Sequence, residues 1–375
     1  MSPEEKLVEA EQLMLSGVSL AHTGAVELII ENAGLKEYIK NHEFDSAKLD
    51  LIFNPGQENA GWGDCYYYKN DEPSTLSNEV IVCGGRSGII NAKKEKFVID
   101  WNNLTFIQGP YATGWGASIG KVVGKIDNCT FSNLGNTRMT LSESPRDGHN
   151  IYAKPDGQIS CTGNKFLACG GNTQFAARPW EQVMPEKISV ILKKNFWSDC
   201  SWNPVGHGGG GSFNIAAYCN TEEGTDIVVE DCIFHNAIPC PGLHITKSEP
   251  SARGVIALWN EAWYPPKKAT DKGFEPDAKY YFKSLKFNNN VIRTTEPDRT
   301  PISIKGCKDI EIKNLKVDYI DYDGKGKHFI KIDEDSDNPN KATKIRIDPI
   351  DAEGTMLFGA WVVQLRDGLV WDAKE

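Results

Sequence analysis

Short stretches of alternating apolar and polar residues recur along most of the chain in two series. The first series places an asparagine or aspartate shortly before an aromatic or branched residue. Its copies read WNNLTF from residue 101, IDNCTF from 126, TGNKF from 162, KKNFW from 193, EDCIF from 230, NNNVI from 288 and KNLKV from 313. The second series reads NIYAK from residue 150, TQFAAR from 173, FNIAAYC from 213, GVIALWN from 254, PISIKG from 301 and HFIKID from 328. Both series are rich in residues that favour short strands.

The spacing of these copies predicts a solenoid of stacked coils. Phe106 and Phe131 are 25 residues apart, as are Ile292 and Val317, and no helical period lies between the strands. Such a rhythm is typical of repeat folds in which each coil packs only on its neighbours. A leucine-rich repeat is excluded because its L-x-x-L-x-L pattern is absent, and a sandwich or barrel would show turns at a denser rhythm.

The coil rhythm, the N-x-F turns and the cysteines beside those turns together resemble the right-handed parallel β-helix superfamily, which includes pectate-lyase-like enzymes and phage tailspike depolymerases. The resemblance covers residues 80–335. It implies an all-β, right-handed parallel β-helix that carries the substrate site. Because a solenoid needs capped ends, we expect an N-terminal cap over residues 1–79, with helices at 3–16 and 24–40. We expect a C-terminal cap of strands over residues 336–375.

Charge and hydropathy exclude two kinds of partner. The net charge of −10 offers no basic stripe for phosphates, so no nucleic acid is expected to bind. The N-terminus lacks a basic-then-apolar signal region, and no apolar run is long enough to span a membrane. We therefore expect no membrane insertion, and a chain that folds in the cytosol or has lost a targeting segment.

Ten cysteines without a C-x-x-C pair argue against the common zinc and thioredoxin motifs. Cys129, Cys200, Cys232 and Cys307 occur in similar turn settings, and buried thiols behave as small hydrophobic groups. We expect them to be reduced core residues, which fits folding in a reducing cytosol without a signal peptide. Phage tail-associated depolymerases usually act as trimers, so the resemblance implies a homotrimer that acts extracellularly and is associated with a virion.

The stretch RDGHNIYAK, residues 146–154, suggests where the chemistry lies. In a strand, alternation directs Ile151 and Ala153 to the core and Tyr152 and Lys154 outward. Aligning the later strands adds to the same column Gln174, Arg178, Asn214, Tyr218, Trp259 or Asn260, Glu261 and Lys305. Cations suit carboxylates and aromatic faces suit sugar rings, so the predicted partner is an acidic polysaccharide. The alternative is that outward residues of any solenoid are polar because they face water.

A first mechanism for such a surface is β-elimination from a uronate-containing polysaccharide, as in a polysaccharide lyase. A cation neutralises the sugar carboxylate, a base removes the neighbouring C5 proton, and an acid protonates the departing oxygen. Lyases of the resembled superfamily often use Lys or Arg as the base, and some lyases of other folds use His with Tyr. The candidate catalytic residues are His149, Tyr152, Lys154, Arg178 and Tyr218.

Two other functions stay open. A glycoside hydrolase would use two carboxylates, and the sequence offers Asp147, Asp156, Glu181, Asp199 and Glu261 without a spacing that pairs them. A non-catalytic spike module would only bind polysaccharide. In each case the candidate substrate-binding residues are Arg146, Asn214, His207, Trp259 and Glu261.

No cofactor is expected. The stretch DEDSDNPNKATK from Asp333 alternates acidic residues like a calcium loop, but it lacks the glycine at the sixth position and ends on Lys344. A loose Ca²⁺ site is therefore the weaker interpretation, and a solvated turn is the stronger one.

Overall fold

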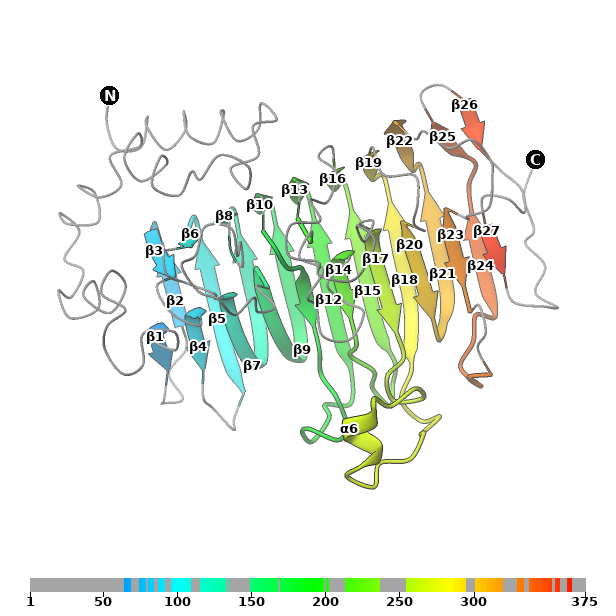
Figure 1. Ribbon diagram of the computed structural model, residues 1–375, viewed down its shortest axis with the longest axis horizontal. Helices are drawn as coiled ribbons and strands as arrows, with labels where there is room; N and C mark the ends of the chain where they lie inside the picture. Colours follow the sequence, from blue (N-terminus) through cyan, green and yellow to red (C-terminus); the bar gives the residue numbers. More distant parts are fainter. Residues whose placement is uncertain are drawn as a thin grey trace, which may run out of the picture.

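The structure is a computed structural model that describes residues 64–68, 74–78, 80–83, 87–91, 96–108, 115–132, 134, 149–167, 169–198, 200–201, 213–236, 254–294, 301–319, 329–333, 337–352, 355–357 and 363–365. Within these residues the protein is all-β, with one helix of four residues, and its strands run parallel in curled sheets. Strands of successive turns lie side by side along the long axis of the molecule (Figure 1). This arrangement is consistent with a parallel β-solenoid, and at this level the predicted fold class is confirmed. The predicted N-terminal helices at 3–16 and 24–40 lie outside the described residues.

The strands form three rows, of which two share the long strands β7 and β9. The first row comprises β1 (Asp64–Tyr68), β4 (Ser87–Asn91), β7 (Trp115–Asp127), β9 (Ile151–Thr162), β11 (Thr173–Phe175), β14 (Phe213–Ala217), β17 (Gly254–Trp259), β20 (Ile302–Lys305), β23 (Ile330–Ile332) and β27 (Val363–Leu365). The second row comprises the C-terminal halves of β7 and β9 with β2 (Ser74–Ser77), β5 (Phe97–Asn102), β12 (Ile188–Lys193), β15 (Thr225–Glu230), β18 (Phe282–Asn288), β21 (Cys307–Lys313) and β24 (Lys344–Ile347).

The third row is a separate sheet. It comprises β3 (Val80–Cys83), β6 (Thr105–Gln108), β8 (Thr130–Ser132), β10 (Lys165–Leu167), β13 (Phe196–Ser198), β16 (Ile233–Asn236), β19 (Val291–Thr294), β22 (Lys316–Tyr319), β25 (Ile350–Ala352) and β26 (Thr355–Leu357). Strand β26 pairs antiparallel with β25, whereas β27 continues the first row parallel to β23. Helix α6 (Lys267–Thr270) lies between β17 and β18, in the segment drawn below the rows in Figure 1.

Strict alternation along the long strands places one set of side chains in the core. In β9, buried and half-buried residues alternate from Ile151 to Asp156, so Ile151 and Ala153 point inward while Tyr152 and Lys154 point outward. Strands β12 and β15 repeat this pattern over their whole length. The expectation from RDGHNIYAK about which residues face the core is therefore confirmed, and the outward side of the first row carries the candidate chemistry.

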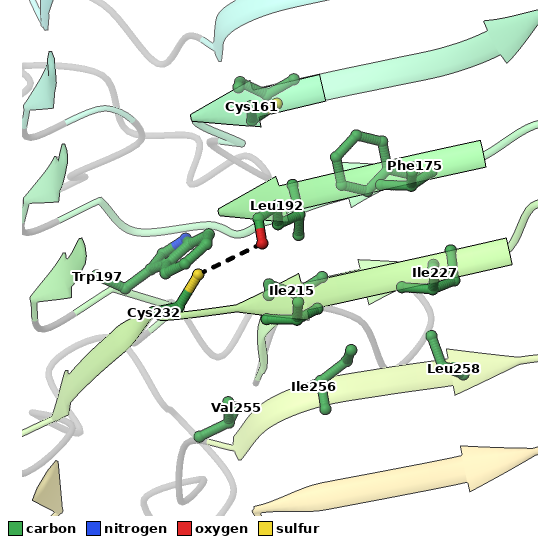
Figure 2. Packing of buried hydrophobic residues seen from close by; sticks show 14 of the residues in the cluster. Cys161, Phe175, Leu192, Trp197, Ile215, Ile227, Cys232, Val255, Ile256 and Leu258 are labelled. Atoms are coloured by element: carbon green, nitrogen blue, oxygen red, sulfur yellow. Dashed lines mark hydrogen bonds between the residues drawn. The ribbon is translucent and has the colours of Figure 1, made fainter. Parts of the chain in front are cut away.

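A column of aromatic rings fills the core beneath the third row. Phe106, Phe131, Phe166, Trp197, Phe234 and Phe287 stack with successive centroid separations of 4.5, 5.0, 4.8, 4.8 and 5.9 Å. The first four separations match the strand spacing of ~4.8 Å, because the rings from Phe106 to Phe234 pair in register on successive strands of the third row. Phe287 continues the stack from β18 of the second row, whereas the third-row residue in register with Phe234 is Ile292. The N-x-F pattern in the sequence is thus the pattern of this column. Figure 2 shows Trp197 beside the inward residues of neighbouring coils.

The corner before each strand of the third row is built by two consecutive residues. The first has a left-handed backbone, with a φ of 54° at Asn103 and at Asn128, 55° at Lys194 and 56° at Asn289. Asparagine and glycine tolerate this conformation best, which explains why the sequence series is rich in asparagine. The second residue of each pair turns inward and is buried: Leu104, Cys129, Asn164, Asn195, Cys232, Asn290 and Leu315.

The buried asparagines of this corner column bind the backbone of the preceding coil. Asn164 Oδ1 accepts the N–H of Cys129 and its Nδ2 donates to the carbonyl of Ile126, both at 2.8 Å. Asn195 does the same one coil later, with the N–H of Asn164 and the carbonyl of Cys161, again at 2.8 Å. Each amide therefore satisfies a buried donor and a buried acceptor that the turn would otherwise leave without partners.

Seven cysteines of the described chain are buried with free thiols: Cys129, Cys161, Cys169, Cys200, Cys219, Cys232 and Cys307. Their arrangement differs from a single ladder, because Asn164 and Asn195 separate Cys129 from Cys232 in the corner column. Cys232 Sγ points to the carbonyl of Leu192 on the preceding coil at 3.6 Å (Figure 2). Burial raises the pKa of the Cys129 and Cys219 thiols to about 12.

We predict that Asn195→Ala destabilises the fold by about 2–4 kcal/mol, because the N–H of Asn164 and the carbonyl of Cys161 lose their partner and each unsatisfied group costs ~1–3 kcal/mol. The control is Asn314→Gly, which removes only an exposed side-chain hydrogen bond to Asn289 and suits the left-handed φ. Chemical denaturation of both variants measures the difference. Equal losses of stability would contradict the role given to the buried column.

We also predict that the buried thiols are inert in the native protein. Cys129 and Cys219 should react with a thiol reagent only after unfolding, because a protonated, buried thiol is a poor nucleophile. Mass mapping of labelled peptides, before and after denaturation, identifies each site, and a reductant should leave the melting temperature unchanged. Native disulfides at these positions would overturn both the core assignment and the expectation of folding in a reducing compartment.

Candidate functional site

The outward side of the first row presents adjacent side chains from successive coils. The pairing of β7, β9, β11, β14, β17 and β20 brings to one level Ser118, Tyr152, Gln174, Ala216, Ala257 and Ser303. At the next level Trp259 pairs with Lys305, and Tyr218 follows directly on β14. Tyr152 packs against the small side chains of Ala176 and Ala216 and against Tyr218. We call this surface the candidate face.

Arg178 joins two segments of the candidate face that are far apart in the sequence. Its Nε donates to Glu261 Oε2 at 2.5 Å and its Nη2 to Glu261 Oε1 at 3.5 Å. Its Nη1 donates to Tyr152 Oη at 3.3 Å and lies 3.6 Å from Glu181 Oε1. Arg178 is buried. Its guanidinium contacts two carboxylates and one phenol within the protein.

Lysines complete this Arg178 cluster, which we define as Tyr152, Lys154, Arg178, Glu181, Glu261 and Lys268. Lys154 Nζ donates to Glu181 Oε2 at 2.8 Å, and Lys268 Nζ, from α6, lies 3.7 Å from Glu181 Oε1. The arginine, lysines and glutamates of the cluster, when ionised, amount to three cations and two carboxylates. The cluster is therefore a positively charged patch on a chain of net charge −10, and it suits an anionic ligand.

Short turns after β11 and β17 position the charged side chains. The chain leaves β11 at Phe175 and folds back at Arg178, whose carbonyl accepts the N–H of Glu181 at 3.0 Å. After β17 the N–H of Glu261 donates to the carbonyl of Trp259 at 2.9 Å. The 178–182 segment also contacts the loop that carries α6, with Trp180 and Phe274 ring centroids 5.1 Å apart. Both glutamates thus sit on turns that neighbouring coils fix.

The two glutamates of the cluster have opposite shifts in pKa. Burial raises the pKa of Glu261 above its ordinary value, although the charge of Arg178 acts against this rise. At Glu181 burial also acts to raise the pKa, but the hydrogen bond and charge of Lys154, together with the charge of Arg178, outweigh it and lower the pKa. Glu261 is therefore the better proton donor of the pair, and Glu181 the more persistent anion.

His149 lies beside the cluster in a defined orientation. Its Nδ1 is 2.7 Å from Asn172 Oδ1, and its ring centroid is 5.5 Å from that of Tyr152. Because a carbonyl oxygen only accepts, Nδ1 carries the hydrogen, and Nε2 carries the lone pair in the neutral imidazole. Tyr218 lies under the cluster, with the Arg178 guanidinium 5.5 Å from its ring centroid.

The structure brings together all five candidate catalytic residues, and adds Glu181 and Glu261 to them. Asn214 is placed differently from the expected column, because it is buried and its amide exchanges hydrogen bonds with Asn236 at 3.1 and 3.4 Å. Among the candidate residues that the structure describes, Trp259 is the most exposed, with 37% of its surface accessible. Arg146, His207, Asp147 and Asp199 lie outside the described residues.

Sequence reasoning did not single out Lys268. It belongs to the insertion between β17 and β18, whose length interrupts the coil rhythm, and no pattern in it points back to Glu181. The double proline before α6 was the available signal, since it starts a short structured insertion.

The described residues offer no cluster of three or more His, Cys, Asp or Glu side chains that could hold a metal ion. The first residue of the calcium-like stretch, Asp333, is buried and accepts the backbone N–H groups of Gly306 at 2.8 Å and Ala342 at 2.6 Å. Its carboxylate thus closes a turn, while residues 334–336 lie outside the described chain. Among the residues that the structure describes, no helix is long and apolar enough to cross a membrane.

Comparison of the chain with protein-family models, with curated proteins and with solved structures found no match.

We predict that Glu181→Gln lowers the stability of the fold at neutral pH by about 1–2 kcal/mol, because hydrogen bonds to charged groups contribute ~1.5–3 kcal/mol and partial exposure weakens them. The pKa of Glu181 is lower in the folded than in the unfolded state. Its contribution is therefore complete above the unfolded-state pKa and is lost as the pH falls through the folded-state pKa. The difference between variant and wild type should accordingly shrink toward acid.

The control for this prediction is Glu230→Gln. The Glu230 carboxylate also forms an ion pair with a lysine, with Lys193 Nζ 2.9 Å from Glu230 Oε2, but that pair is more exposed. Exposed ion pairs contribute only ~0–1 kcal/mol to the stability of a fold. Thermal melts of both variants between acid and neutral pH measure the effect. A difference for Glu181→Gln that stays constant with pH would show that the charge of Glu181 is not what stabilises the turn.

Proposed function

We propose that the protein is an enzyme that cleaves an acidic, uronate-containing exopolysaccharide by β-elimination on the candidate face. The observation that carries this proposal is the contact of Arg178 Nη1 with Tyr152 Oη at 3.3 Å, with the His149 ring directly beside Tyr152. The reaction needs a cation, a base and an acid, and a guanidinium, an imidazole and a phenol that lie beside one another can fill these three roles. The right-handed pectate-lyase-like class, a virion association and a trimeric assembly belong to the same proposal.

We assign proton abstraction to His149. The reaction needs a base that removes the C5 proton of the uronate, so that the electron pair forms the C4–C5 double bond and the C4–O bond breaks. The bond from Nδ1 to Asn172 leaves the lone pair of the neutral ring on Nε2, which is the atom that would take the proton. Lys154 is the other candidate base, but its ammonium donates to Glu181 at 2.8 Å. We therefore give Lys154 a substrate-binding role.

We assign protonation of the departing oxygen to Tyr152. Arg178 donates to the phenolic oxygen, so the hydrogen of the phenol points away from Arg178. The same guanidinium stabilises the negative charge that develops on the sugar as the C5 proton leaves. Tyr218, beneath Arg178, supports the guanidinium through its ring face.

The opposite pKa shifts of Glu181 and Glu261 favour a second candidate, hydrolysis of the glycosidic bond. In that reaction a carboxylic acid with a raised pKa protonates the leaving oxygen while a carboxylate acts as the base or nucleophile. Glu261 would be the acid and Glu181 the carboxylate. Arg178 lies between them, so a substrate would have to displace its contact with at least one of the two.

The first experiment separates these functions. The protein is incubated with a panel of acidic exopolysaccharides while the ultraviolet absorbance of unsaturated uronate and the number of reducing ends are followed together. Elimination raises both signals, hydrolysis raises only the reducing ends, and a purely binding module raises neither.

Variants then test the residue roles. We predict that Tyr152→Phe lowers turnover by ~10²–10⁴-fold, the usual contribution of a general acid, with little change in melting temperature. The control is Tyr281→Phe, since this half-buried tyrosine lies outside the candidate face and its hydroxyl donates to the carbonyl of Glu223. Arg178→Lys keeps the charge but loses the planar two-pronged contact, so its activity should be intermediate. Full activity of Tyr152→Phe together with an inactive Glu261→Gln would replace elimination by hydrolysis.

A further inference from the structure

A second group of side chains on the candidate face combines an ammonium with two aromatic rings. Trp259 ends β17 and pairs in register with Lys305, which ends β20. Lys305 Nζ lies 4.6 Å from the ring centroid of Trp259 and 5.9 Å from that of Tyr264. The two rings stand nearly perpendicular, at 78° with centroids 6.4 Å apart. They form two walls of a corner with a cation at its edge.

Hydrogen bonds to neighbouring segments fix the position of this corner. Trp263 Nε1 and Tyr264 Oη both donate to Asp337 Oδ1 at 3.2 Å, which ties the segment after β17 to a loop more than seventy residues further on. Asn260 is buried, and its N–H donates to the carbonyl of Lys305 at 3.1 Å. Gly306 has a φ of 76°, and a Cβ there would lie 2.7 Å from Asn260 Cβ. The backbone that presents Trp259 and Lys305 is therefore fixed before any ligand arrives.

The cation of this corner differs from those of the Arg178 cluster in its partners. Arg178, Lys154 and Lys268 lie against glutamates, whereas Lys305 lies over two aromatic faces. An exposed cation–π contact is weak, so the ammonium can turn from the rings to a ligand carboxylate at little cost. A sugar ring can then occupy the partly exposed indole face of Trp259. In the Arg178 cluster each cation already contacts a glutamate, so a ligand carboxylate must compete with that glutamate for it.

We propose that Trp259, Tyr264 and Lys305 form a subsite for an acidic sugar unit next to the cleaved linkage, and that Lys305 recognises its carboxylate. This inference rests on the proposed function. Glu261, which contacts Arg178, follows Trp259 by two residues, so the corner adjoins the Arg178 cluster. The carboxylate that sets substrate preference is thus bound at Lys305, and the reacting unit at Arg178.

Binding measurements test this subsite without relying on cleavage. The probes are oligosaccharides of polygalacturonate, alginate and hyaluronate, each in its native form and with its carboxyl groups reduced to alcohols. Dissociation constants are measured by calorimetry on the full chain, in the Tyr152→Phe background so that cleavage is slow during the measurement.

For at least one native probe, Lys305→Gln should raise Kd by about tenfold, since it removes a charge-assisted contact, and should leave Kd for the reduced probe unchanged. Trp259→Ala should weaken binding of both forms, because both sugars stack on the indole. Lys305→Arg should keep most of the preference for the native form. The matched control is Lys308→Gln, since Lys308 Nζ also lies over an aromatic ring, that of Tyr281 at 3.7 Å.

The subsite is overturned if no native probe binds, or if Lys305→Gln and Lys308→Gln change Kd equally. Cleavage of the polysaccharide by the wild-type protein tests the proposed enzymatic function independently of the subsite. Selective binding at Lys305 without any cleavage by the wild type would leave the subsite standing and reject the enzymatic function. Cleavage that is insensitive to Lys305→Gln and Trp259→Ala would keep the enzyme and reject the subsite.

Discussion

The constraint on which the rest of this structure depends is the register between one coil and the next. Backbone pairing alone fixes register weakly, because a parallel ladder looks the same at every second residue. In this protein the buried asparagine at the corner removes that freedom. Asn164 and Asn195 each bind an N–H and a carbonyl of the preceding coil, and both bonds fit only one alignment. From Phe106 to Phe234 the aromatic column then packs ring on ring, since each of these rings follows the same corner on its coil.

A fixed register is what allows residues distant in sequence to form a site. Arg178 and Glu261 are 83 residues apart, yet they meet because their strands are held two coils apart at matching levels. The coils between and around them differ greatly in length, since long segments follow β13, β16 and β17. The described insertion between β17 and β18 leaves the pairing of both strands with their neighbours intact and places Lys268, from α6, beside Glu181. The strand rows therefore supply the spacing, and this insertion supplies one charge of the cluster.

The sequence predicts the parts of this arrangement that local alternation controls. Ile151 and Ala153 in the core and Tyr152 and Lys154 outside it were predicted, because strand side chains alternate. The N-x-F turns predicted the repeat of the coils, but not the stacking of their rings. The Arg178–Glu261 pair could not be predicted, since insertions of unequal length hide which turns share a level. Asn214 has the outward parity of its strand but is buried by Asn236 from another row, a contact that no pattern along a single strand encodes. The cysteines were predicted to be core residues but not their interruption by asparagine, because both residues fill the same inward corner position.

On the candidate face, the cation proposed to act in the reaction differs from the cation proposed to provide affinity. Glu261 satisfies Arg178 from within the protein, so an anionic substrate that contacts Arg178 must replace a carboxylate already there. In the proposed elimination, such an exchange would contribute little to affinity in the ground state, yet it would place the guanidinium where charge develops in the transition state, which is the condition for catalysis rather than for tight binding. The burial that raises the pKa of Glu261 eases the exchange, since a glutamate that takes up a proton releases its arginine. Under that proposal affinity has to come from elsewhere on the face, and Lys305, whose ammonium lies over two ring faces, is the group that we propose to supply it.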